Sequence, residues 1–170
     1  MSCIIKSGYS LGCKSSLGGI QEAYVASFSG ATSYTYDVDD VITGVTSAND
    51  FYTYEQRNES GEFVQNGNHS VENGSNFWSQ EVSLIFTKND AALRNSLKLL
   101  AQSTLLVIVL DQNGTYWVIG EQNGADLTAS SASAGRAYGD LNGTTVTLTG
   151  KEPNTAREIS ASAFATLTVI

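Results

Sequence analysis

The dipeptide Asn-Gly occurs five times in this chain of 170 residues, at Asn66, Asn73, Asn113, Asn123 and Asn142. Both residue types tolerate the positive backbone φ of tight turns, so Asn-Gly is the strongest short-range signal for a β-hairpin. The sequence contains a single proline, Pro153, and therefore little that would keep neighbouring strands from pairing. These features predict a mainly β protein with antiparallel strands.

Apolar and alternating runs between the turns mark the candidate strands. The clearest hairpin joins the apolar run 104–110 to 115–119 through Asn113-Gly114, and Asn142-Gly143 precedes a run of alternating threonines. The predicted strands are 20–28, 34–38, 41–45, 76–86, 104–110, 115–119, 144–149 and 164–170.

One segment has a helical pattern instead. Leu93, Leu97 and Leu100 recur at helical spacing within 90–103, and Asn89 or Asp90 can cap the N-terminus of such a helix. The pattern predicts one helix that packs on the sheet through these leucines.

The negative charge of the chain is confined to one stretch. Residues 29–86 contain nine acidic residues and one basic residue, Arg57, so the net charge of this stretch is −8. This value equals the net charge of the whole protein. Disordered acidic segments are poor in aromatic residues, whereas this stretch is rich in them. We therefore expect the charge to lie on an ordered β surface, although a merely soluble acidic domain would show the same composition.

The middle of the acidic stretch, 55–75, is polar, rich in Gly and Asn, and almost without apolar residues. It is predicted to be a long flexible loop between two strand arms, 34–45 and 76–86, that together form a long hairpin. Such arms would expose sheet edges in a lone subunit, and a neighbouring subunit is the expected cover.

The length favours a single domain over residues 1–170. Cys3 and Cys13 are the only cysteines, either as two reduced thiols or as one disulfide. The longest apolar run, 105–110, is far shorter than the roughly 20 residues of a membrane helix. No signal-peptide pattern precedes Cys13, so the protein is expected to be intracellular when it is synthesised.

Catalytic patterns are missing from the sequence. The single histidine, His69, lies among Asn, Gly and Ser, and there is no G-x-S-x-G motif or phosphate loop. Asp37, Asp39 and Asp40 are clustered carboxylates without the spacing of a helix-loop-helix calcium site. The expectation is a protein that is not an enzyme and has no metal or cofactor. The lack of a basic patch argues against tight binding of nucleic acid.

The opening of the chain resembles a family of virus proteins. The motif consists of Cys3, Gly8, Leu11-Gly12-Cys13-Lys14 and Leu17-Gly18-Gly19-Ile20, followed by a strand. It is similar to the start of structural proteins of tailed bacteriophages of the crAss-like, Bacteroides-infecting kind. The order of strands, long hairpin, helix and final hairpin resembles tail tube proteins and related ring proteins.

This resemblance implies an antiparallel β-sandwich or half-barrel with one flanking helix. Six copies would form a ring whose strands close one inner barrel, and stacked rings would form a conduit for DNA ejection in the virion. The implied partners are other copies, neighbouring tail or neck proteins, and DNA in transit, with no membrane. The candidate lumen-facing acids are Asp37, Asp39, Asp40 and Glu81. The candidate inter-subunit residues are Tyr34, Tyr36, Val38, Trp78, Val82 and Leu84.

Two other functions compete with the structural one. A carbohydrate- or ligand-binding β-sandwich could use Tyr52, Tyr54, Phe77 and Trp78 as a stacking platform. A small hydrolase of unrecognised type would need a pair of carboxylates that the sequence does not single out.

Overall fold

The computed structural model describes residues 8–170, so Cys3 lies outside the described part, while Cys13 is exposed. The mainly β, mostly antiparallel fold class is confirmed, with a second short helix that the sequence did not predict. The elements are β1 (Ile20–Ser27), β2 (Ser33–Tyr36), β3 (Ile42–Thr46), β4 (Tyr52–Glu55), β5 (Glu62–Ser70), β6 (Ser75–Thr87), α1 (Ala91–Leu100), β7 (Leu105–Asp111), β8 (Tyr116–Ile119), β9 (Ala125–Ser133), β10 (Gly143–Glu152), β11 (Arg157–Ile159) and α2 (Ala161–Phe164).

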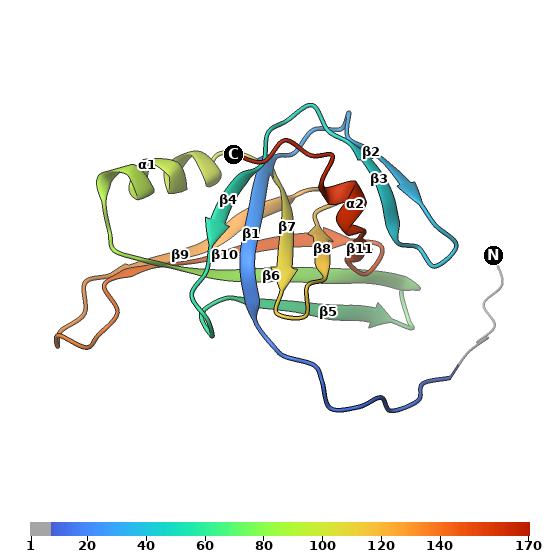
Figure 1. Ribbon diagram of the computed structural model, residues 1–170, viewed down its shortest axis with the longest axis horizontal. Coiled ribbons are helices and arrows are strands. Elements are labelled where there is room, and N and C mark those ends of the chain that lie inside the picture. Colours follow the sequence, from blue (N-terminus) through green and yellow to red (C-terminus); the bar gives the residue numbers. More distant parts are fainter. Residues whose placement is uncertain (1–7) are drawn as a thin grey trace.

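The eleven strands form one sheet that bends over itself into two facing layers (Figure 1). The first layer has the order β4-β1-β7-β8-β11-β3-β2, and the second has the order β9-β10-β6-β5. The layers are joined where Leu105 of β7 pairs with Ala125 of β9. All paired strands are antiparallel except β3 and β11, which meet in parallel at Ile42 and Ile159.

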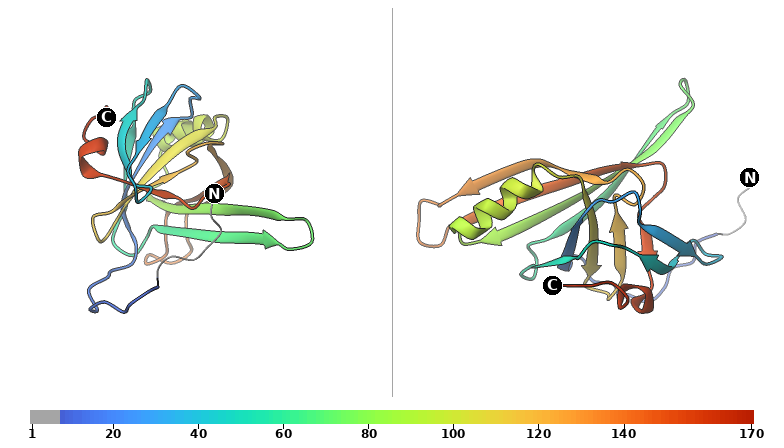
Figure 2. Two further views of the ribbon diagram at one scale, coloured as in Figure 1. Left: turned by 90° about the vertical axis from the view of Figure 1, so that its right-hand side faces the viewer. Right: turned by 90° about the horizontal axis from the view of Figure 1, so that it is seen from above.

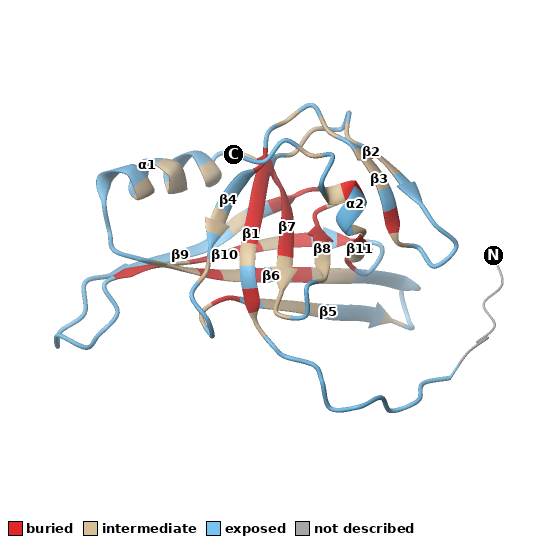
Figure 3. Ribbon diagram, viewed as in Figure 1, coloured by how far each residue is buried: buried red, intermediate tan, exposed pale blue. Residues whose placement is uncertain are grey.

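The main core lies between the two layers (Figure 3). Val82 and Leu84 of β6 alternate with polar residues and point inward, where they are fully buried against the first layer. Each fully buried aliphatic side chain contributes about 1.5–3 kcal/mol to folding. The buried members of this core are Ile20, Ala23, Val25, Val82, Leu84, Leu105, Val107, Val109, Ile119, Ala125, Val146 and Leu148.

A second core covers the opposite face of the first layer. Ile42, Phe51 and Ile159 are buried there beneath α2 and the C-terminal segment. The first layer is therefore apolar on both faces, which explains why β7 is an almost uninterrupted apolar run.

The predicted helix is confirmed as α1. The carboxylate of Asp90 accepts a hydrogen bond from the backbone N–H of Leu93 (2.7 Å) and so caps the helix. Leu97 and Leu100 pack against the main core, as their spacing predicted, and Leu93 is half-buried.

The hairpin at Asn113-Gly114 is also confirmed. The N–H of Gly114 donates to the carbonyl of Asp111, and the N–H of Asp111 donates to the carbonyl of Thr115. Gly114 has φ +82°, a conformation that L side chains rarely adopt. The turn therefore requires the glycine that the sequence supplies.

The prediction of a long flexible loop at 55–75 is wrong. Nine of the 21 residues form strand β5, which pairs with β6 from Glu62–Ser83 to Ser70–Ser75. Asn66-Gly67 lies inside this strand rather than in a turn, and a Cβ at Gly67 would lie too close to His69 and Trp78. The turn of this hairpin is at Asn73-Gly74, and the hairpin projects well beyond the body of the protein (Figure 2).

The predicted pairing of the two arms is also wrong. Segment 34–45 contributes β2 and β3 at one end of the strand order, whereas 76–86 belongs to β6 near the other end. Backbone pairing of β5 with β6, which leaves little trace in hydrophobicity, is the physical reason for both errors.

The predicted terminal strand 164–170 does not form. Ser160 caps α2 by accepting a hydrogen bond from the N–H of Ala163, and Phe164 ends this helix. The last residues form an isolated bridge, between Val169 and Phe51, with backbone hydrogen bonds that join Thr168 and Ile170 to Phe51 and Thr53. Phe164 stacks on Tyr116 with ring centroids 4.3 Å apart, so its apolar character serves the second core.

Candidate assembly surface

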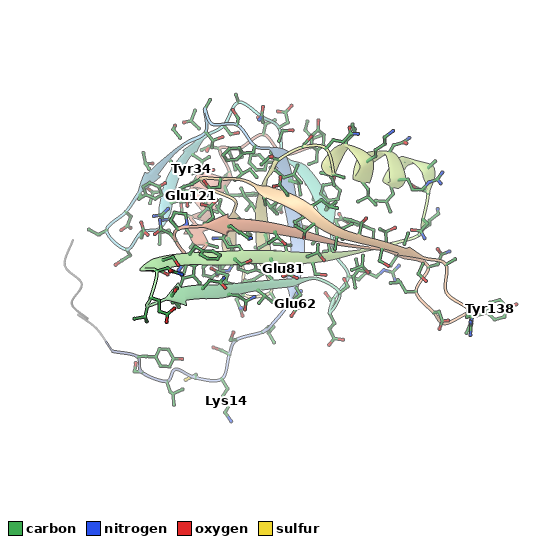
Figure 4. The ribbon with its side chains drawn as sticks, turned by 180° about the vertical axis from the view of Figure 1, so that it is seen from behind. Lys14, Tyr34, Glu62, Glu81, Glu121 and Tyr138 are labelled. Atoms are coloured by element: carbon green, nitrogen blue, oxygen red, sulfur yellow. The ribbon has the colours of Figure 1, made fainter. Side chains whose placement is uncertain are left out.

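The second layer has one covered and one uncovered face. Val82 and Leu84 point into the core, so Glu81 and Ser83 between them point to the opposite side. The registers place Val64, Glu81, Thr149 and Asp126 in one row across β5, β6, β10 and β9. We call this surface the open face, and Figure 4 looks onto it with Glu62 and Glu81 labelled.

Hydroxyl and acidic side chains dominate the open face. Thr145, Thr147 and Thr149 of β10 alternate with buried residues and line its centre. Glu62, Glu81 and Asp126 are exposed, and Lys151 is the basic residue among them. The open face therefore carries mild net negative charge without an apolar patch. Its members are Glu62, Val64, Asn66, Ser79, Glu81, Ser83, Ile85, Asp126, Thr128, Ala129, Ser131, Thr145, Thr147, Thr149 and Lys151.

Both outer edges of the second layer are free of strand partners over most of their length among residues 8–170. The N–H of Ile85 donates to the side chain of Gln56 (2.9 Å), on the side of β6 that faces β5. Because successive N–H groups of a strand point to opposite sides, this hydrogen bond shows which residues of β6 direct their N–H groups toward β5 and which toward β10. Following the registers outward, Phe63 and Gln65 of β5 direct their N–H groups to the free edge. On β9 the same alternation directs the N–H of Ser130 to the free edge and that of Ser131 to β10.

The two free edges run in opposite directions. Four antiparallel strands lie in the second layer, and an even number makes the first and last strands antiparallel to each other. A rotation that keeps the strand axes aligned therefore brings β5 of one copy beside β9 of the next in antiparallel orientation. Such a contact is head-to-tail and can close into a ring.

The structure separates the acids that were predicted to face one lumen. Glu81 lies on the open face, whereas Asp37, Asp39 and Asp40 lie in the loop between β2 and β3, at the far end of the first layer. Asp40 also has an internal partner, because its carboxylate accepts a hydrogen bond from Arg157 (2.9 Å). These acids are close in the sequence, but the bend of the sheet places them in different layers, which the sequence did not reveal.

Arg157 of β11 ties the β2–β3 hairpin to the body. Its guanidinium donates to both carboxylate oxygens of Glu121 (2.7 and 2.8 Å) and lies 4.7 Å from the ring centroid of Tyr36. The hydroxyl of Tyr36 donates to Glu121 (2.6 Å). Burial and this hydrogen bond raise the pKa of Tyr36 to about 12. Arg157 and Glu121, which the sequence analysis missed, therefore hold the hairpin in place.

The predicted inter-subunit residues have different positions. Val82 and Leu84 are in the core of the subunit, so they are not available to a neighbour. Tyr36 is engaged by Arg157 and Glu121, Tyr34 is half-buried, and Trp78 is half-buried against His69. Val38 at the tip of the β2–β3 loop is fully exposed.

The four aromatic residues of the ligand-binding alternative do not form one platform. Tyr54 packs on Phe86 at one end of β6, with ring centroids 5.5 Å apart. Phe77 is nine residues further along β6, about 30 Å away at roughly 3.3 Å per residue. The Nδ1 of His69 is hydrogen-bonded to the side-chain oxygen of Asn76 across the hairpin (2.7 Å), which gives His69 a local structural contact. Within 8–170 no three potential metal ligands gather.

Glu152, at the end of β10, is a buried carboxylate. It is 3% exposed, and its Oε1 accepts hydrogen bonds from the N–H groups of Gln122 (3.1 Å) and Asn123 (2.8 Å). Its Oε2 has no hydrogen-bond partner among the described residues. Burial raises the pKa of Glu152 above its ordinary value, and the two hydrogen bonds offset only part of that change.

This raised pKa predicts a pH-dependent stability. Between the ordinary and the raised pKa, the folded chain keeps a proton that the unfolded chain has lost, so stability falls as the pH rises through this window. Glu152→Gln keeps the Oε1 acceptor and cannot ionise. We expect the free energy of unfolding of the variant, minus that of the wild type, to increase as the pH rises above the ordinary Glu pKa of about 4. A difference that is independent of pH would contradict this assignment.

Comparison with known proteins adds no relative. No protein-family model matches the sequence, and no curated protein is significantly similar to it. None of the helices in the described part is long and apolar enough to cross a membrane. Function therefore has to be argued from the open face and its two edges.

Proposed function

We propose that the protein is a structural subunit of a phage virion, which forms a ring or stacked tail tube for the passage of DNA. The observation that carries the proposal is the second layer, with two free edges of opposite direction and one uncovered face. Pairing of β5 with the β9 of a neighbour would continue the sheet from copy to copy, satisfy the edge N–H and C=O groups, and remove the aggregation hazard of open edges.

Sheet geometry supports six copies in the ring, the number implied by the resemblance to tail tube proteins. Six copies supply roughly 24 strands about 4.8 Å apart, which gives a barrel roughly 37 Å across for untilted strands. Four copies would give only about 24 Å between backbones, and side chains take several ångströms from each wall. The larger barrel is wide enough to pass a DNA duplex.

The open face has suitable chemistry for the inner wall of such a barrel. DNA carries about one negative charge per 1.7 Å of duplex, so a basic wall would retain it. Glu62, Glu81 and Asp126 would repel the phosphates mildly, and the threonine rows offer small hydroxyl groups without apolar patches. The wall would let DNA move without binding it.

Particle mass in solution tests the proposal. The subunit has a mass of 18.1 kDa, and we expect the purified protein to form particles of about six subunits, or stacks of such particles. A discrete monomer at high concentration would contradict the proposal.

A further inference from the structure

Asn-Gly dipeptides can modify themselves without an enzyme. The backbone nitrogen of the glycine attacks the side-chain carbonyl carbon of the asparagine and closes a cyclic imide, and the side-chain nitrogen leaves as ammonia with the proton of the glycine N–H. Water then opens the imide to aspartate or to isoaspartate, whose backbone runs through the former side chain. The reaction requires a side-chain amide and a glycine N–H that are free of hydrogen bonds, and a backbone that can bend.

The dipeptide at Asn113 fails these requirements because both of its reacting groups are bonded. The Nδ2 of Asn113 donates a hydrogen bond to the carbonyl of Leu17 (2.9 Å), and its Oδ1 accepts one from the N–H of Leu17 (2.8 Å). The N–H of Gly114 donates to the carbonyl of Asp111 (3.2 Å). Attack of Gly114 on Asn113 would break these hydrogen bonds, so the folded chain protects this dipeptide.

The dipeptides at Asn123 and Asn142 are protected by the burial of their glycines. Gly124 and Gly143 are both buried, and Gly143 pairs with strands on both of its sides, as the first residue of β10. The Nδ2 of Asn123 also donates to the carbonyl of Lys151 (2.8 Å). The backbone at both dipeptides can bend only if the surrounding sheet opens.

The dipeptide at Asn66 lies in the middle of β5. Asn66 and Gly67 are paired with Ser79 and Trp78 of β6, which keeps their backbone extended. The side chains of His69 and Trp78 lie close to Gly67 and leave it little room. Attack of Gly67 on Asn66 would therefore require β5 to separate from β6.

The dipeptide Asn73-Gly74 meets every requirement. It lies in the exposed turn of the β5–β6 hairpin, beyond the body of the protein (Figure 2). The backbone N–H of Asn73 donates to the Oγ of Ser70 (3.3 Å), but the Asn73 side chain and the N–H of Gly74 make no hydrogen bond with residues 8–170. Apart from the chain neighbours, no atom lies within 4 Å of the position that a Cβ on Gly74 would occupy, so the turn has room to bend.

We infer that Asn73 is a site of spontaneous deamidation in the folded protein, whereas the other four Asn-Gly dipeptides stay largely intact. This inference does not depend on the proposed function. Each event replaces a neutral amide by a carboxylate beside Glu72, and the isoaspartate product also lengthens the backbone of the turn. The age of a molecule is then recorded as added negative charge at the end of the projecting hairpin.

Peptide mapping by mass spectrometry tests this inference. The folded full-length protein is kept in mildly alkaline buffer, because loss of the glycine N–H proton speeds the attack. The protein concentration is low, so that contacts between copies do not shield the turn. We expect Asn73 to deamidate at least about ten-fold faster than each of the other four asparagines. Digestion in water labelled with heavy oxygen marks any deamidation that occurs during sample preparation.

The unfolded chain is the matched control. In denaturant the five dipeptides lose their structural differences, so their rates should agree within a few-fold. In the folded protein, Asn73→Gln should remove the fast event, because the longer side chain closes its ring far more slowly. Equal rates at the five dipeptides of the folded protein, or faster reaction at any other one, would overturn the inference. So would an Asn73 that stays intact in the folded protein for a time that suffices for its complete deamidation in the unfolded chain.

Discussion

Replacement of Ser130 by proline is expected to leave the subunit folded and to weaken ring assembly strongly. The N–H of Ser130 points to the free edge of β9, so proline removes no hydrogen bond within the subunit. In the ring, the proline would delete an inter-subunit donor worth about 1 kcal/mol, and its pyrrolidine ring would obstruct the approaching strand. The loss recurs at every interface, so we expect the concentration for assembly to rise more than ten-fold.

Neighbouring substitutions provide the controls for this prediction. Ser130→Ala keeps the backbone donor and should assemble like the wild type. Ser131→Pro removes a donor that points to β10 and should destabilise the subunit itself. For each of the three variants, particle mass measures ring assembly, and the free energy of unfolding measures the stability of the subunit. Normal rings from Ser130→Pro would show that β9 is not an interface edge.

Reversal of charge on the open face is expected to create DNA binding. Changing Glu62, Glu81 and Asp126 to lysine should leave folding nearly intact, because exposed charges usually contribute within about 0.5 kcal/mol each. Six copies would then line the passage with a dense basic surface. Each lysine that neutralises a phosphate releases counterions, so the new affinity should fall steeply with salt.

The control for this experiment carries the same change of charge elsewhere. Asp39, Asp50 and Glu158 are exposed and lie outside the open face, and their replacement by lysine should produce much weaker DNA retention. The measurement is DNA binding by assembled rings across a salt series. Equal DNA binding by both triple variants, or no DNA binding by the open-face variant at low salt, would show that the open face does not line the passage.

Elements with local signals could be predicted from the sequence, whereas strands that depend on a distant partner could not. Turn chemistry at Asn113-Gly114 and the capped leucine pattern of α1 depend on neighbouring residues, and both predictions are confirmed. Strand β5 depends on pairing with β6, so a polar sequence rich in Gly and Asn concealed it. Strand β9, made largely of Ala, Ser and Thr, was missed for the same reason.

The candidate surface was predictable only in part. Glu81 was identified because it alternates with apolar residues, and it lies on the open face. Glu62 and Asp126 join it through register across the sheet, which a single sequence does not encode in its periodicity. Asp40 looked equally suited to a lumen until the fold placed Arg157, 117 positions away, against its carboxylate.

Electron microscopy of the purified full-length protein tests the central claim most directly. We expect closed rings or tubes with an open centre, whose inner wall at subnanometre resolution is a continuous sheet built from β9, β10, β6 and β5 of successive copies. Particles that are compact monomers, or rings in which the open face points outward, would contradict it.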